Sequence, residues 1–237
     1  AFDANAFGSY WFETGTPTYL VHLLRMQDYS LERMSDEYTT EDVLNSVDVA
    51  STNPIPVIYQ SGYLTIKEYD SEFRTYHLGF PNAEVADGFF RFLLPYYTSL
   101  NPVEAPFHIQ KFVQEIRTGN PEAFLTRLKS FFSDTPYELV KDLENHYQNV
   151  LFILFKLLGV YVRAEYHTSR GRIDMVLQSR DYTYVMEFKL DGTAEDALRQ
   201  IMDREYPLPF STDGTTVFRI GLNFSSETRN IEKWVIG

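Results

Sequence analysis

The chain has 237 residues, of which 44% are hydrophobic and 23% are charged, a composition typical of a folded globular protein and not of a disordered one. Its 21 basic and 33 acidic residues give a formal charge of −12, which argues against a protein that coats nucleic acid through a broad basic surface. The absence of cysteine excludes disulfides, thiolate zinc sites and cysteine catalysis, and it fits the cytoplasmic location that we expect.

Residues 1–98 carry helix signals interrupted by one hairpin signal, and we expect a helical, winged-helix-like region there. Thr16-Pro17 predicts a helix start, a cap followed by a first-turn proline. Further helices are expected over residues 40–47 and 54–62. Alternation on both sides of a polar turn predicts a β-hairpin over residues 63–78.

The expected hairpin has two interpretations. In a winged-helix protein it would contact DNA, and otherwise it is a packing or protein-contact module. Residues 54–80 carry Lys67 and Arg74 as basic residues against Glu68, Asp70 and Glu72. This acidic balance counts against phosphate binding by the hairpin.

Prolines mark residues 99–136 as a helical connector. A helix is expected to begin at Pro81, and prolines predict a linker over residues 95–105. Two helices are then expected over residues 107–117 and 121–132, separated by a Gly-Asn-Pro turn.

Residues 137–237 are expected to form a third region in which helices and strands alternate. A helix should run from about residue 137 to Leu158, where Gly159 ends it. The apolar stretch 150–162 is shorter than the roughly 20 residues that span a bilayer, so we expect no membrane segment. Alternation predicts strands over 160–167, 172–177, 183–190, 216–222 and 231–236, with a helix over 193–206 after the third strand.

The third of these strands carries the residues that indicate chemistry. Glu187 and Lys189 are two positions apart and therefore share one face of the strand. If the neighbouring strand pairs antiparallel with it, Asp174 lies opposite Glu187. Two converging carboxylates repel each other unless a cation lies between them, and oxygen ligands without nearby His or Cys favour Mg²⁺ or Mn²⁺. Such an ion polarises a phosphodiester and lowers the pKa of bound water, and Lys189 would orient or deprotonate that water or offset phosphate charge.

Residues 144–201 resemble the PD-(D/E)XK nuclease superfamily in the order and structural setting of its motif. The resemblance rests on Glu144 in the first helix, on Asp174 in Gly171-Arg172-Ile173-Asp174, on Glu187-Phe188-Lys189, and on Gln200 in the next helix. It implies an α/β (α+β) fold with a restriction-endonuclease-like α-β-β-β-α-β core, a central mixed sheet flanked by helices. It also implies metal-dependent cleavage of nucleic-acid phosphodiesters. The implied roles are metal binding by Asp174, Glu187 and Glu144, catalysis by these residues with Lys189, and nucleic-acid contact by Arg172 and Gln200.

The string from Gly171 to Gly192 is similar to one bacterial branch of this superfamily, in which the nuclease domain follows an AAA-ATPase-like module. Residues 10–17 resemble the tail of that module, so residues 1–98 would be its C-terminal part. No Gly-x-x-x-x-Gly-Lys-Ser/Thr loop occurs in the chain. We therefore expect the chain to begin after the nucleotide site of a longer protein and not to hydrolyse ATP. The implied partners are nucleic acid, with DNA as the expected substrate, and the parent protein's ATPase module; a homo-oligomer stays open.

Alternatives remain for the secondary residues and for the whole chain. Glu144 is either an auxiliary metal ligand or a helix-surface carboxylate, and Gln200 is either a nucleic-acid contact or an exposed glutamine. Arg172 either contacts a phosphate or pairs with a neighbouring acid, and His167 either carries a proton or is structural. The charge of −12 favours the alternative of an inactive nuclease-like module for protein or nucleic-acid recognition, regulating the ATPase-like partner. The third hypothesis for the function of the chain is a winged-helix regulator whose C-terminal domain is structural.

Overall fold

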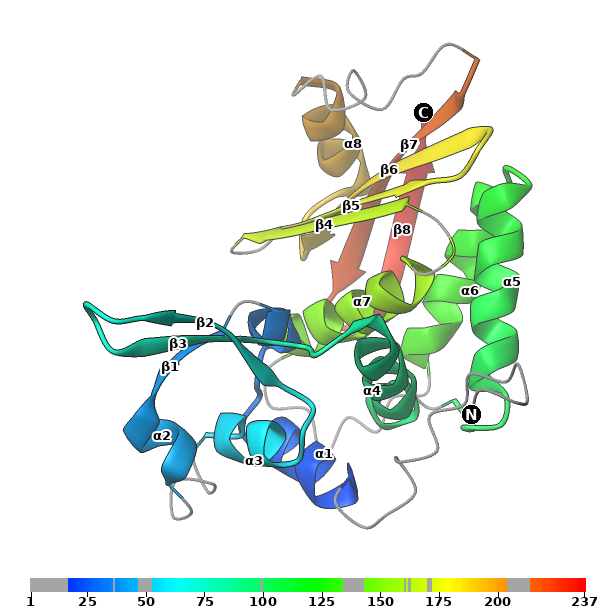
Figure 1. Ribbon diagram of the computed structural model, residues 1–237. Helices are drawn as coiled ribbons and strands as arrows, with labels where there is room; N and C mark the ends of the chain where they lie inside the picture. Colours follow the sequence, from blue (N-terminus) through cyan, green and yellow to red (C-terminus); the bar gives the residue numbers. More distant parts are fainter. Residues whose placement is uncertain are drawn as a thin grey trace. The chain divides into compact units, whose positions relative to one another are not determined.

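The computed structural model describes residues 17–35, 37–46, 53–98, 100–133, 143–159, 161, 163–169, 172–203 and 214–237. For some of these, including Arg172 and Asp174, the description covers the backbone alone. The chain divides into two compact units, Ala1–Leu93 and Leu94–Gly237, which are treated separately (Figure 1). Within the described ranges, no helix is both long enough and apolar enough to cross a bilayer.

The first unit contains short helices and one small sheet. The expected hairpin is present as β2 and β3, and β1, a strand that the sequence did not predict, pairs antiparallel with β3 to give the order β1-β3-β2. β1 has four residues, too few for an alternation to stand out. The elements are α1 (Pro17–Met26), η1 (Leu31–Ser35), β1 (Glu37–Thr40), α2 (Glu41–Asn45), α3 (Ile55–Gln60), β2 (Thr65–Asp70) and β3 (Thr75–Gly79). Helix α4 (Ala83–Tyr97) begins in this unit, and its last residues belong to the second.

Helix α4 continues beyond the point where the linker was expected to begin, so the prediction of a linker from Pro95 was wrong. Pro95 lies inside the last turn of α4. A proline there removes one helical hydrogen bond, which costs less near the end of a helix than in its middle. Burial of Leu93, Leu94 and Tyr97 favours the helical conformation through this turn.

The second unit is built on a five-stranded mixed sheet of order β4-β5-β6-β7-β8. Neighbouring strands are antiparallel except β6 and β7, which are parallel and are connected through α8. The α-β-β-β-α-β order from α7 to β7 confirms the expected core; residues 137–142 and 204–206 of the expected helices lie outside the described ranges. The elements are α5 (Ala105–Arg117), α6 (Pro121–Ser133), α7 (Leu143–Leu158), β4 (Arg163–Ser169), β5 (Arg172–Gln178), β6 (Tyr182–Leu190), α8 (Ala194–Asp203), β7 (Thr216–Ser225) and β8 (Asn230–Ile236).

Helices cover both faces of this sheet (Figure 1). On one face, aromatic rings of α6 and α7 pack against β7: the ring centroids of Phe132 and Tyr147 lie 4.9 and 4.6 Å from that of Phe224. On the other face, Ile201 of α8 packs with Val185 of β6 and Val176 of β5. The central strand β6 is therefore buried on both sides, which positions the residues of its α8 face beneath a helix.

The helices that we expected in a connector, α5 and α6, belong to the same unit as the sheet. Their shared ion pair joins Arg127 of α6 to Glu115 of α5, with a shortest N–O distance of 2.6 Å. The Tyr184 hydroxyl of β6 donates a hydrogen bond to the Glu115 carbonyl oxygen at 3.1 Å. This contact connects the helical hairpin to the central strand.

Candidate functional site

The pairing of β5 with β6 aligns the two acidic positions of the predicted motif. The strands are antiparallel, as predicted, and Asp174 is the direct register partner of Glu187. Arg172 is the partner of Lys189 on the same ladder. Paired positions of an antiparallel ladder lie on one face of the sheet, about 4.5–5.5 Å apart at Cα. Both acidic positions therefore belong to the sheet face that α8 covers.

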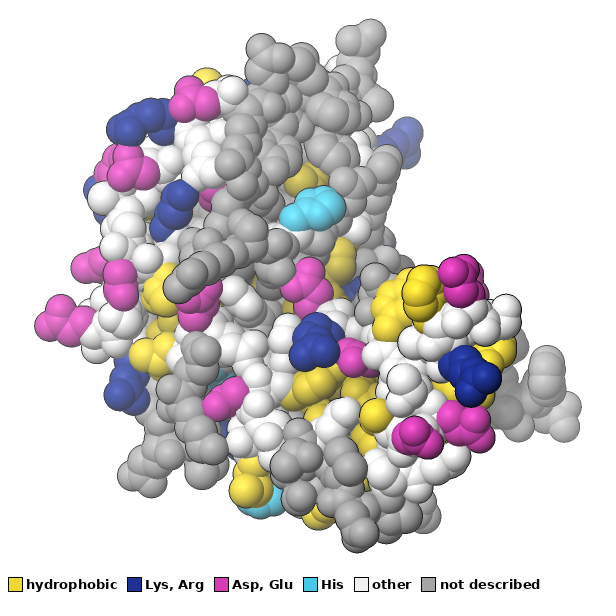
Figure 2. Space-filling view, turned by 90° about the vertical axis from the view of Figure 1, so that its left-hand side faces the viewer, with side chains coloured by type: hydrophobic (Ala, Val, Ile, Leu, Met, Phe, Trp, Pro, Cys, Tyr) yellow, Lys and Arg dark blue, Asp and Glu magenta, His cyan; other side chains and the backbone are white. Residues whose placement is uncertain are grey.

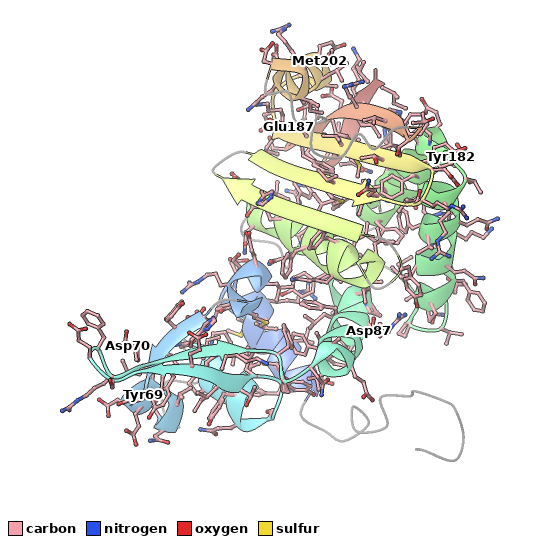
Figure 3. The ribbon with its side chains drawn as sticks, turned by 45° about the horizontal axis from the view of Figure 1, so that its top comes forward. Tyr69, Asp70, Asp87, Tyr182, Glu187 and Met202 are labelled. Carbon is pink, nitrogen blue, oxygen red and sulfur yellow. The ribbon has the colours of Figure 1, made fainter. Side chains whose placement is uncertain are left out.

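The carboxylate of Glu187 is buried, with a relative exposure of 1%. Figure 3 labels it on the sheet close to α8, the helix that carries the labelled Met202. Burial penalises an ionised carboxylate unless positive charge or hydrogen bonds compensate. The ammonium group of Lys189 lies 3.8 Å from Glu187 Oε1, which is ion-pair distance but too long for a hydrogen bond.

Lys189 links this carboxylate to helix α8. Its Nζ donates a hydrogen bond of 2.5 Å to Oε1 of Gln200, and its side chain is 26% exposed. The ammonium group is thus held between a buried carboxylate and an amide oxygen at the edge of solvent. The structure brings Glu187, Lys189 and Gln200 together, although Gln200 comes from another element.

Gly221 of β7 explains how α8 approaches the sheet closely enough for this contact. It is the parallel register partner of Glu187. A Cβ atom at Gly221 would lie 2.1 Å from the carbonyl oxygen of Ala194 and 2.5 Å from the backbone nitrogen of Leu198. Only glycine allows the backbone of α8 to lie this close to the strand beside Glu187. The sequence analysis missed this residue; its signal was a glycine inside an apolar strand.

A tight turn after β6 lies against the other side of Lys189. Asp191 has a left-handed φ of 51°, and its N–H donates to the Phe224 carbonyl at 2.8 Å. Its Oδ1 accepts the Ser226 N–H at 2.7 Å, and hydrogen bonds from Ser226, chiefly that of the backbone amide, hold the pKa of Asp191 below its usual range. A Cβ at Gly192 would lie 3.0 Å from Lys189 Cβ. The turn therefore packs on the aliphatic stem of Lys189.

Comparison with known proteins finds a family model that matches this region. Residues 142–234 match the family model described as the PD-(D/E)XK nuclease superfamily. This segment of the chain is therefore similar to that superfamily. The matched segment contains the β5–β6 pair, Lys189, Gln200 and Glu144, and we call it the nuclease-superfamily domain.

The chain is also similar to a protein named "Uncharacterized protein in vnfD 5'region" from Azotobacter chroococcum mcd 1. The two are 29% identical over 244 residues, an alignment that covers 99% of this chain and 47% of that protein. The chain thus spans about half the length of that relative. No solved structure matches the chain.

Two further predicted residues of the nuclease-superfamily domain are Glu144, whose side chain the structure describes, and Arg172, whose backbone alone it describes. Glu144 lies in the first turn of α7, and its Oε1 accepts a hydrogen bond of 3.3 Å from Gln148. Tyr147 of this helix packs on the sheet face opposite Glu187. Arg172 is located by its backbone, in register with Lys189. Roles for Glu144 at a metal ion and for Arg172 at nucleic acid stay predictions.

His167 of β4 is the register partner of Asp174. The sheet thus aligns His167, Asp174 and Glu187 in one row across three strands, and the His167 side chain is exposed. The side chains described in the structure include no group of three or more His, Asp or Glu residues near enough to hold a metal ion, and Asp174 is not among them.

Proposed function

We propose that the nuclease-superfamily domain hydrolyses nucleic-acid phosphodiester bonds with the help of a divalent cation. The observation that carries the proposal is the register of β5 and β6, which opposes Asp174 to the buried Glu187 beside Lys189. Burial of the Glu187 carboxylate opposite a second acidic position is costly unless positive charge or hydrogen bonds compensate it. A divalent cation bound by these two residues would offset that cost.

The residues present fit magnesium or manganese. Asp174 and Glu187 offer carboxylate oxygens, and the chain has no cysteine to favour a softer metal. The ammonium group of Lys189 lies 3.8 Å from Glu187 Oε1 and donates its short hydrogen bond to Oε1 of Gln200. Asp174 and Glu187 would hold the ion, with Glu144 as an auxiliary ligand from α7.

The chemistry then divides between the ion and the protein. A bound divalent ion lowers the pKa of a water ligand and polarises the phosphodiester. Lys189, kept in place by Gln200, would hydrogen-bond to the attacking water or to a non-bridging oxygen of the scissile phosphate as negative charge builds up there. Arg172, in register with Lys189, would contact a phosphate of the bound strand.

The charge distribution supports substrate binding through a few groups at the site. Among the described side chains on the face drawn in Figure 2, Lys and Arg are interspersed with Asp and Glu and form no wide basic patch. With a formal charge of −12, the chain would rely on the metal ion and a few cations at the site to bind phosphates. DNA is the substrate that we propose.

The charge also favours a second candidate, an inactive nuclease-like module that recognises protein or nucleic acid. In that case the domain would regulate the AAA-ATPase-like part of a longer protein, as the resemblance implies. Cleavage and metal binding by the chain separate the two candidates.

A cleavage assay on plasmid and single-stranded DNA with manganese tests the proposal. We expect the wild type to cut, a chelator to stop it, and Glu187→Gln to reduce the rate by about 100-fold or more, because the carboxylate that holds the ion is lost. Glu227→Gln, at an exposed carboxylate in the β7–β8 turn, is the matched control and should keep the wild-type rate. Wild-type cleavage by Glu187→Gln would refute this site, and no cleavage by the wild type would favour the recognition module.

A further inference from the structure

The turn that follows β6 is fastened to the end of β7. Asp191 makes hydrogen bonds to Phe224 and Ser226 through its N–H and its carboxylate, and the N–H of Gly192 donates to Oδ1 of Asn223 at 2.9 Å. Because Gly192 packs on the stem of Lys189, the position of this turn limits where the stem can lie. Of these hydrogen bonds, the one to Asn223 is made by Gly192, the residue that contacts the Lys189 stem.

Asn223 is well placed to fix the turn. It is the parallel register partner of Lys189 and is only 4% exposed. Both polar atoms of its amide make hydrogen bonds: Oδ1 accepts from the Gly192 N–H, and Nδ2 donates to Oε2 of Glu232 at 2.9 Å. A buried amide with a donor and an acceptor engaged on opposite sides has one defined orientation.

A β-bulge supplies the second partner. In the β7–β8 ladder, Asn223 pairs with Lys233 and Phe224 pairs with Ile231, which leaves Glu232 as the extra residue. Bulges re-aim side chains and are frequent near active sites. Here the extra residue is Glu232 of the edge strand β8, and its carboxylate accepts the hydrogen bond from the amide of Asn223.

We propose that Asn223, oriented by Glu232, is a positioning residue for Lys189. The proposal rests on the function proposed above, in which Lys189 acts at the scissile phosphate. Without the Asn223 amide, the Gly192 N–H loses its acceptor, and the turn, although still held by the hydrogen bonds of Asp191, restrains the Lys189 stem less. The ammonium group then samples positions away from Glu187, while the metal-binding carboxylates are unaffected.

The test compares Asn223→Ala with Asn223→Asp and with the double variant Asn223→Asp/Glu232→Gln, in which the carboxylate and the amide exchange places. Asn223→Asp keeps an acceptor for Gly192 but opposes a second carboxylate to Glu232. Adding Glu232→Gln restores a donor to that carboxylate, so the double variant should behave like the wild type. Ile220→Val controls for general destabilisation, because Ile220 is buried in the same strand on the opposite face.

The first readout needs no nuclease activity: the rate at which a soluble amine-acylating ester labels Lys189, followed by peptide mass spectrometry. We expect labelling several-fold faster than the wild type in Asn223→Ala and Asn223→Asp, and close to the wild type in the double variant and in Ile220→Val. The second readout is cleavage, where kcat should fall about 10- to 100-fold in Asn223→Ala with KM and manganese affinity unchanged.

The outcomes separate this proposal from the proposed function. If Asn223→Ala labels and cleaves like Ile220→Val, or if the double variant stays like Asn223→Asp, Asn223 does not position Lys189, whatever the wild type cleaves. If labelling changes as expected but the wild type cuts no DNA, the positioning stands and the nuclease function fails.

Discussion

At the scale of single residues, the candidate site combines a buried carboxylate, a tethered lysine and a strained turn. Lys189 contacts Glu187, Gln200 and the stem-packing Gly192, so its freedom is restricted from several sides. Preorganised side chains of this kind reduce the entropy lost on reaching a reactive geometry. The site thus has the rigidity that the role proposed for Lys189 would need.

Asp191 gives a prediction for the pH dependence of stability. Hydrogen bonds from Ser226 lower its pKa in the folded protein, so the ionised carboxylate stabilises the fold above the unfolded-state pKa of about 3.9, and this contribution is lost as the pH falls through the folded-state pKa. We expect Asp191→Asn to lower the melting temperature slightly near neutral pH and to match the wild type below that range, measured by thermal unfolding. Asparagine also adopts the left-handed φ of 51°, so the comparison isolates the charge. An equal difference at all pH values would contradict this explanation.

At the scale of elements, the contact between α8 and β7 decides whether Gln200 can reach Lys189. Gly221 allows this contact, since no side chain fits between the strand and the backbone of α8 at Ala194 and Leu198. Helix α8 is in turn anchored by Ile201 in the apolar cluster on β5 and β6.

Gly221→Ala is therefore expected to displace α8 or to prevent its docking. The added methyl group would overpack this contact, at a cost of about 1–3 kcal/mol in the free energy of unfolding, and cleavage should fall as Gln200 moves away from Lys189. Urea unfolding and the cleavage assay measure the two effects. Gly159→Ala is the control, because its added Cβ would lie 3.3 Å or more from its neighbours. A Gly221→Ala variant with wild-type stability would show that α8 does not rest on β7 as described.

The sequence predicted the strands of the motif because alternation is long and regular in β5 and β6, and their short turn implied the antiparallel pairing that aligns Asp174 with Glu187. It could not predict β1, whose four residues are too short for a period. It also missed Asn223 and Gly221, since their roles depend on the parallel pairing of β6 with β7, a contact between strands separated by α8. Local patterns do not report such pairings.

At the scale of the whole molecule, the chain joins a small β-sheet unit to the unit that holds the nuclease-superfamily domain. The chain spans about half the length of its relative from Azotobacter chroococcum mcd 1. The formal charge of −12 applies to both units together and disfavours long-range attraction of nucleic acid.

Nucleic-acid binding should accordingly depend on the divalent ion. With Lys189→Met, which should slow cleavage, we expect DNA affinity to be detectable with manganese and to fall at least about 10-fold with a chelator. The dependence of affinity on salt should be shallow, because few phosphates are neutralised by side chains. Fluorescence anisotropy with a labelled oligonucleotide measures both. Tight, steeply salt-dependent binding in the chelator would indicate a basic surface instead of a metal-centred site.

The most direct test of the central claim is calorimetric titration of manganese into the wild type and Asp174→Ala at neutral pH, with circular dichroism to verify that both are folded. The register of β5 and β6 pairs Asp174 with Glu187, and we propose that these two residues hold one metal ion. We predict saturable binding by the wild type that disappears in Asp174→Ala. Equal binding by both proteins, or no binding by the wild type, would contradict a metal centre at Asp174 and Glu187.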